Sequence, residues 1–266
     1  MSQGKDAKTR RARLTLAGLG VLAAGVLVGG GYGVAVLLDD DGGGTPAAGA
    51  PATTAPPAHP SGPASPSGSG EVSKTPDTGP KMRLFKPTGH ADGVATGFKY
   101  SAVDAVSAAV YWWEEYAWLD DQKARQQLEA MASPDADGYV DQEVSKVRKL
   151  REQVGLPSSG GTTSSITFTT TVQAVHVTSL PVEGEKPGAV VEVWMSYDRF
   201  ATGPDGAPDK EPLKDELTSV ILRWQGDRWR LTNQPGYVKH SHVPVSYLPD
   251  SPYAWRDGWR QVVREG

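Results

Sequence analysis

An uncharged, apolar stretch runs from Leu14 to Leu38 and consists mostly of Leu, Val, Ala and Gly. At about 1.5 Å per residue, a helix of this length crosses a hydrocarbon layer of roughly 30 Å and satisfies its own backbone hydrogen bonds in lipid. Basic residues precede the stretch within residues 1–13, and three aspartates follow it at 39–41. Because basic flanks stay in the cytoplasm, we expect a single-pass protein of the cytoplasmic membrane, with residues 1–13 inside, 14–38 in the bilayer and the rest outside.

A cleaved signal peptide is the alternative for this stretch. Its apolar core would normally span about 7–15 residues, which is shorter than the stretch seen here and favours a retained helix. Small residues from Thr45 to Ala50 nevertheless offer a cleavage site. Glycines at 25, 29 and 33 lie near one helix face, a spacing found in helix dimers, so a homo-oligomer is one possibility.

Residues 39–80 contain mainly Pro, Ala, Gly, Ser and Thr, with hardly any large apolar side chain. Such a segment cannot bury enough surface to offset the entropy of ordering it, so we expect a disordered linker. A flexible coil of this length spans roughly 35 Å on average, and a fully extended one about 120 Å.

The composition excludes several classes of function. The chain has no cysteine, which removes disulfides, thiolate catalysis and cysteine-ligated zinc. Its formal net charge of −4 does not favour nucleic-acid binding through a basic surface. Neither a phosphate-binding glycine loop nor a serine nucleophile elbow occurs.

Residues 81–266 carry all eight tryptophans and are expected to form one extracytoplasmic domain. Its first half reads as helices. Ser101 and Asp104 fit a capping box that opens a helix ending near Trp118, and further apolar stripes predict helices over 121–132 and 139–154. Arg151 interrupts the stripe of the third helix, so we expect that helix to be less deeply buried.

The second half of this domain reads as strands. Alternating apolar residues predict strands over 166–178, 189–201, 217–225 and 228–232, with a hairpin turn at Gly226-Asp227. The apolar phase changes inside the first strand, which indicates a bulge. Near the end, Ser251-Pro252 predicts a short helix with Trp255, Trp259 and Val262 on one side. Helices followed by consecutive strands indicate an α+β domain with an antiparallel sheet.

The hairpin from Val220 to Leu231 places one tryptophan on each side of its turn. This Trp–turn–Trp pattern, together with the order of elements over 101–232, resembles the nuclear-transport-factor-like (cystatin-like) superfamily. The resemblance implies helices packed on a curved antiparallel sheet. The segment from Gln234 to Gly266 departs from the minimal fold of that superfamily.

The layout of basic tail, membrane helix, linker and outer domain resembles the bitopic scaffold proteins of type IV secretion and conjugation systems in Gram-positive bacteria. This resemblance implies a structural role in a cell-envelope machine, with other envelope proteins as partners. It supplies no motif that could be transferred residue by residue. We therefore predict a non-enzymatic scaffold or accessory protein without cofactor.

Two sets of residues are candidates for function. Trp112 and Tyr116, from a crowded aromatic segment, are candidate exposed contacts for a partner, although packing against the sheet explains them as well. The alternative function, a small-molecule-binding or enzymatic domain, would use the concave face of the sheet, with His176 paired to Asp198 or Tyr197. His240 and His242 have the spacing of two metal ligands on a strand, but no third ligand is indicated, so no metal site is predicted.

Overall fold

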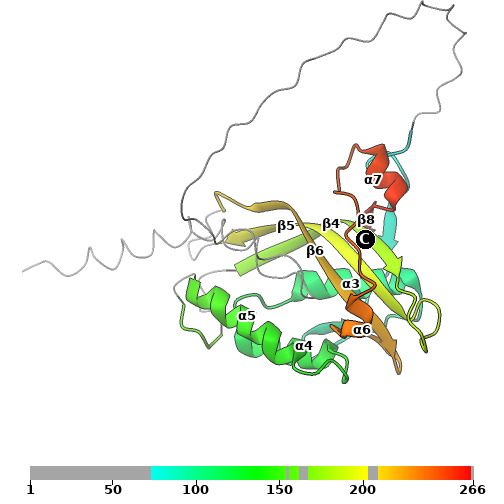
Figure 1. Cartoon of the computed structure of the whole chain (residues 1–266). Coiled ribbons are helices and arrows are strands. Elements are labelled where there is room, and N and C mark those ends of the chain that lie inside the picture. Colours follow the sequence, from blue (N-terminus) through cyan, green and yellow to red (C-terminus); the bar gives the residue numbers. More distant parts are fainter. Residues whose placement is uncertain (1–72, 154–155, 162–166, 203–208, 265–266) are drawn as a thin grey trace, which may run out of the picture. The chain divides into compact units, whose positions relative to one another are not determined.

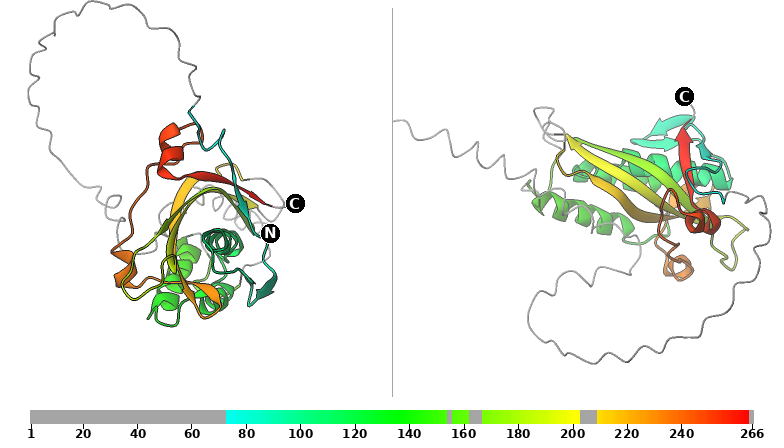
Figure 2. Two further views of the ribbon diagram at one scale, coloured as in Figure 1. Left: turned by 90° about the vertical axis from the view of Figure 1, so that its right-hand side faces the viewer. Right: turned by 90° about the horizontal axis from the view of Figure 1, so that it is seen from above.

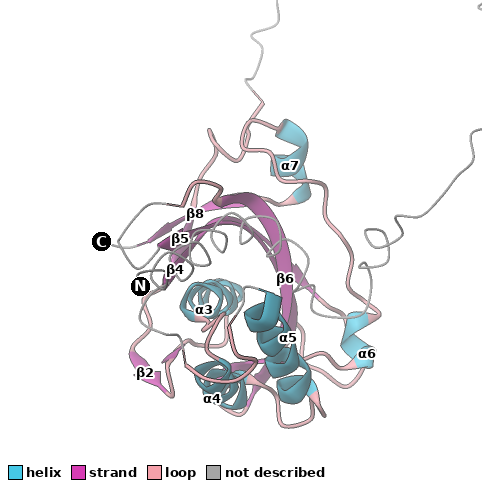
Figure 3. Ribbon diagram, turned by 90° about the vertical axis from the view of Figure 1, so that its left-hand side faces the viewer, coloured by secondary structure: helices cyan, strands magenta, loops and turns pink. Residues whose placement is uncertain are grey.

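The computed structural model describes residues 73–153, 156–161, 167–202 and 209–264, all of which belong to one compact unit. It is an α+β domain in which a mostly antiparallel sheet curls into a half-barrel around a long helix (Figure 1, Figure 3). The predicted fold class is confirmed at this level. The expected membrane helix at 14–38 lies outside the described residues, as does all but the end of the expected linker. No helix in the described part of the chain is long and apolar enough to cross a membrane.

The main sheet has six strands in the order β1-β8-β4-β5-β6-β7, and only the pair β1–β8 is parallel. These strands are β1 (Met82–Leu84), β4 (Thr167–Ser179), β5 (Val190–Thr202), β6 (Leu213–Gln225), β7 (Arg228–Leu231) and β8 (Arg260–Arg264). A separate hairpin consists of β2 (Gly89–Ala91) and β3 (Val94–Thr96). The helices are α3 (Ala102–Glu115), α4 (Asp121–Met131), α5 (Tyr139–Gln153), α6 (Pro235–Val238) and α7 (Pro252–Asp257).

The capping box predicted for α3 is confirmed, because the Ser101 hydroxyl accepts a hydrogen bond from Asp104 N. The helix ends at Glu115, three residues earlier than expected. The amide N–H of Ala117 donates to the side chain of Gln127 in α4 instead of continuing the helical ladder. A tertiary hydrogen bond therefore ends α3, which its apolar pattern could not show.

The hydrophobic core lies on the concave side of the sheet. Figure 3 shows α3 inside the curve of the sheet, with α4 and α5 beside it. Side chains of α3, including Val106, Val110 and Trp113, pack against buried strand residues such as Val193 and Met195. The predicted bulge in β4 is confirmed by a shift of register between Val172 and Ala174.

The convex side of the sheet is covered by the C-terminal extension, residues 233–259. Figure 2 shows this segment passing along the outer side of the sheet from α6 to α7. Trp259 is fully buried there with Ala174 and Trp194. The expected single helical face with Trp259 and Val262 is wrong, because Gly258 adopts a φ of +121° and ends α7, so both residues lie outside the helix.

Arg151 is also placed differently from its expectation. Its exposed fraction is 2%, so it does not reduce the burial of α5. Its guanidinium group donates to the carbonyl oxygens of Leu119, Pro157 and Gly161. An arginine can replace an apolar residue on this stripe because the surrounding backbone satisfies its donors.

Candidate functional site

The two aromatic residues expected as exposed contacts are buried. Trp112 is 4% exposed and Tyr116 is 6% exposed, and their ring centroids lie 4.9 Å apart. They belong to a core enclosed by the sheet on one side of α3 and by α4 and α5 on others. Neither side chain is available for a partner in this arrangement.

The proposed acid–base pair of His176 and Asp198 is not formed. In the register of β4 and β5, His176 lies opposite Trp194, whereas Asp198 lies opposite Thr171. The Asp198 carboxylate accepts hydrogen bonds from Asp215 N at 3.0 Å and from the Gln173 side chain at 3.3 Å. It therefore secures the local irregularity between β5 and β6 and faces no His176 ring.

His176 holds the C-terminal extension against the convex side of the sheet. Its Nε2 donates to the carbonyl oxygen of Asp257 at 2.9 Å, and its ring lies 5.8 Å from that of Trp259. Burial lowers the pKa of His176, while Asp257 opposes this shift and His242 adds to it. The ring is thus neutral near pH 7 and acts as a structural latch. No group of three potential metal-ligating side chains occurs in the described ranges.

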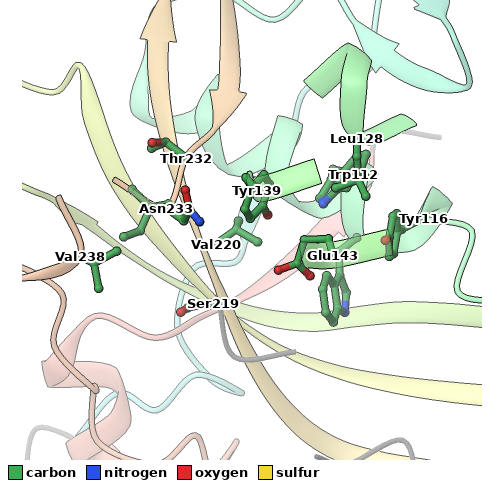
Figure 4. A pocket seen from close by; sticks show the side chains of 12 residues that line it. Trp112, Tyr116, Leu128, Tyr139, Glu143, Ser219, Val220, Thr232, Asn233 and Val238 are labelled. Carbon is green, nitrogen blue, oxygen red and sulfur yellow. The ribbon is translucent and has the colours of Figure 1, made fainter. Parts of the chain in front are cut away.

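A polar cluster that the sequence did not indicate lines a hollow beside α5. Figure 4 shows the Glu143 carboxyl group between Tyr116 and Tyr139 on one side and Ser219 on the other. Glu143 is 6% exposed, and burial raises its pKa although the Lys146 ammonium, 2.7 Å away, opposes that shift. Burial also raises the pKa of both tyrosines, and the negative charge of Glu143 adds to this effect.

The size of this hollow limits what it can hold. Its volume is about 30 Å³, enough for one or two water molecules at roughly 10–15 Å³ each. The Tyr116 hydroxyl has no hydrogen-bond partner, so a water between it and Glu143 would satisfy both. The i, i+4 spacing of Tyr139 and Glu143 on the third predicted helix was the one signal in the sequence that could have placed them together.

Exposed apolar side chains are concentrated in the C-terminal extension. Within eleven residues, the exposed fractions are 76% for Val243, 46% for Val245, 56% for Leu248 and 70% for Tyr253. We call these four side chains the extension patch. Single exposed apolar residues are normal on a protein surface, but a concentrated set is typical of an interaction site.

Comparison of the chain with protein-family models, with curated proteins and with solved structures gives no match. The functional conclusion therefore depends on the layout of the chain and on the residues described above.

Proposed function

We propose that the chain is a membrane-anchored, non-enzymatic scaffold or accessory protein of a bacterial envelope machine, with conjugation or secretion as the suggested setting. Its outer domain binds other envelope proteins. The layout predicted from the sequence supports this role, because a membrane helix and a linker reaching up to about 120 Å would hold the domain within range of neighbouring complexes.

The observation that carries the proposal is the extension patch. Val243, Val245, Leu248 and Tyr253 stay exposed although the backbone between them is fixed to the sheet. Trp259 Nε1 donates to Val245 O at 2.8 Å, and Trp194 Nε1 donates to His242 O at 3.1 Å. Exposed apolar side chains on a fixed backbone lose little entropy when a partner covers them.

The faces of the sheet support a protein partner over a small molecule. The concave face is filled by α3 and the convex face by the extension. The hollow at Glu143, at about 30 Å³, has no room for an organic substrate.

Site-specific photo-crosslinking in intact cells tests this role. A photoreactive amino acid replaces Leu248 in the full-length chain, and a matched variant carries it at Glu129, an exposed residue of α4. The proposal predicts a discrete adduct with an envelope protein at Leu248 and none at Glu129. Adducts only with lipid, or equal labelling at both positions, would contradict it.

Glu143 supports a second candidate function, a catalytic or small-molecule-binding site. A buried carboxyl group with a raised pKa beside two tyrosines has the chemistry of a general acid or base. For this function the hollow would have to open by movement of α5. Soaking a small-molecule fragment library against the protein, with Glu143→Gln as control, separates the two candidates. A fragment bound at Glu143 and lost in the variant would favour the catalytic or ligand-binding function.

A further inference from the structure

Arg199 is a buried cation without a carboxylate partner. It lies on β5 with an exposed fraction of 4%, and its Nε donates to the Thr170 hydroxyl at 2.9 Å. Its guanidinium carbon lies 3.6 Å from the centre of the Trp118 ring. Burial lowers its pKa to about 10. No carboxylate of the described residues lies within 4.0 Å of it, although Glu216 contributes at longer range. A buried charge without a partner is unfavourable unless something compensates it.

Other unpartnered donors surround this cation. Seven buried polar side-chain atoms of the described residues lack a hydrogen-bond partner, and four of them belong to one group of touching side chains. The four atoms are Arg199 Nη2, Trp113 Nε1, Trp118 Nε1 and Tyr116 Oη. The ring of Trp118 lies 4.5 Å from that of Trp113 and 4.9 Å from that of Tyr116. Aromatic ring faces are weak acceptors, so these contacts do not replace full hydrogen bonds.

We infer that these four side chains form a binding site for an oxyanion, a carboxylate above all, carried by a small molecule or by the end of a polypeptide. The three nitrogen atoms can only donate, and one of them carries a positive charge. An anionic acceptor is the ligand that would satisfy all of them together, and hydrogen bonds to charged groups are the stronger kind. This site is separate from the extension patch and does not depend on the role proposed for it.

A hollow of about 240 Å³ adjoins the cluster and is lined by Tyr116 and Trp118 among others. Three carboxylates also lie in its wall, and each is already engaged. Glu114 accepts from Val172 N and Arg264, Glu115 from His90, and Asp120 from Lys123 N. The donors of the cluster therefore have no acceptor among these side chains, and the hollow provides the space by which an anion reaches them.

Thermal unfolding of the full-length chain in detergent tests this site. Sodium acetate and sodium phosphate are compared with sodium chloride at equal ionic strength. A second pair of probes is N-acetyl-trialanine with a free or an amidated C-terminus. Binding to the folded state raises the melting temperature in proportion to ln(1 + [L]/Kd), and the indole N–H signals of Trp113 and Trp118 shift in nitrogen-15 spectra. Acetate acting alone identifies a free anion as sufficient, whereas an effect of only the free-carboxylate peptide identifies a polypeptide end.

The variants separate binding from folding. Arg199→Met removes the charge and keeps the packing volume, so it abolishes the anion effect and leaves the melting temperature in chloride unchanged or higher. Trp118→Phe keeps the ring and removes one donor, which weakens binding about two- to tenfold. Arg230→Met, which also removes one positive charge, leaves the effect intact. No shift with any probe, or a shift that persists in Arg199→Met, would overturn the inference. A lower melting temperature of Arg199→Met in chloride, with no anion effect in the parent chain, would instead assign Arg199 a structural role with Glu216.

Discussion

Arg151→Met is expected to destabilise the domain strongly, because this arginine joins three backbone segments. Its Nε lies 2.8 Å from Pro157 O, and its Nη1 donates to Gly161 O at 3.3 Å and to Leu119 O. Methionine fills similar space but leaves these carbonyl oxygens without a donor in a buried site. Hydrogen bonds from charged donors contribute about 1.5–3 kcal/mol, and the long contact to Gly161 contributes less. We therefore expect the free energy of unfolding to fall by about 3 kcal/mol, which lowers the melting temperature by roughly 6–12 °C in a domain of this size.

Urea unfolding followed by tryptophan fluorescence measures this effect. The matched control is Lys149→Met, on the exposed side of α5, which should change the free energy of unfolding by less than about 0.5 kcal/mol. A loss below about 1 kcal/mol for Arg151→Met would show that water or a rearranged loop satisfies the carbonyl oxygens. The contribution assigned to Arg151 would then be wrong.

Three further predictions concern the extension and the two perturbed ionisable groups. Trp259→Phe removes the donor to Val245 O and should cost about 1–3 kcal/mol, with faster proteolysis near the extension patch as the readout. The folded-state pKa of His176 lies below its ordinary value of 6.5, so its contribution to stability is present above pH 6.5 and is lost as pH falls toward the lowered value. Chemical unfolding across this range should show a weaker pH dependence for His176→Gln. The pKa of Glu143 lies above 4.5, so the opposite holds: its contribution is lost as pH rises through the raised value, and Glu143→Gln should lack this loss. Equal pH profiles for either variant and the parent chain would contradict the assignment.

Local signals in the sequence were sufficient for the helices and the long hairpin. The cap at Ser101, the apolar stripes of α4 and α5 and the turn at Gly226-Asp227 each act over a few residues. The change of apolar phase in β4 likewise marks a bulge within one strand. These elements follow from neighbouring residues, so their positions agree with the expectations to within a few residues.

Features that depend on distant parts of the chain could not be predicted in this way. The burial of Trp112 and Tyr116 depends on several elements closing around α3, and an aromatic segment looks the same whether it is enclosed or exposed. His176 belongs to the convex side because the extension places Trp259 and Asp257 against it. The cluster at Arg199 likewise joins β5 to residues beyond the end of α3. The most informative residues for function are therefore those whose neighbours come from elsewhere in the sequence.

The parallel pairing of β1 with β8 sets an order of events during synthesis. Met82 pairs with Val262, and the two residues are 180 positions apart in the chain (262 − 82). At roughly 5–20 residues per second, the ribosome adds the second partner about 9–36 s after the first. The strands from β4 to β7 can pair with one another before that time, whereas β1 has to wait for the last strand of the chain. The sheet is completed at the pair that joins the two ends of the domain, so loss of the last few residues would leave its first strand without a neighbour.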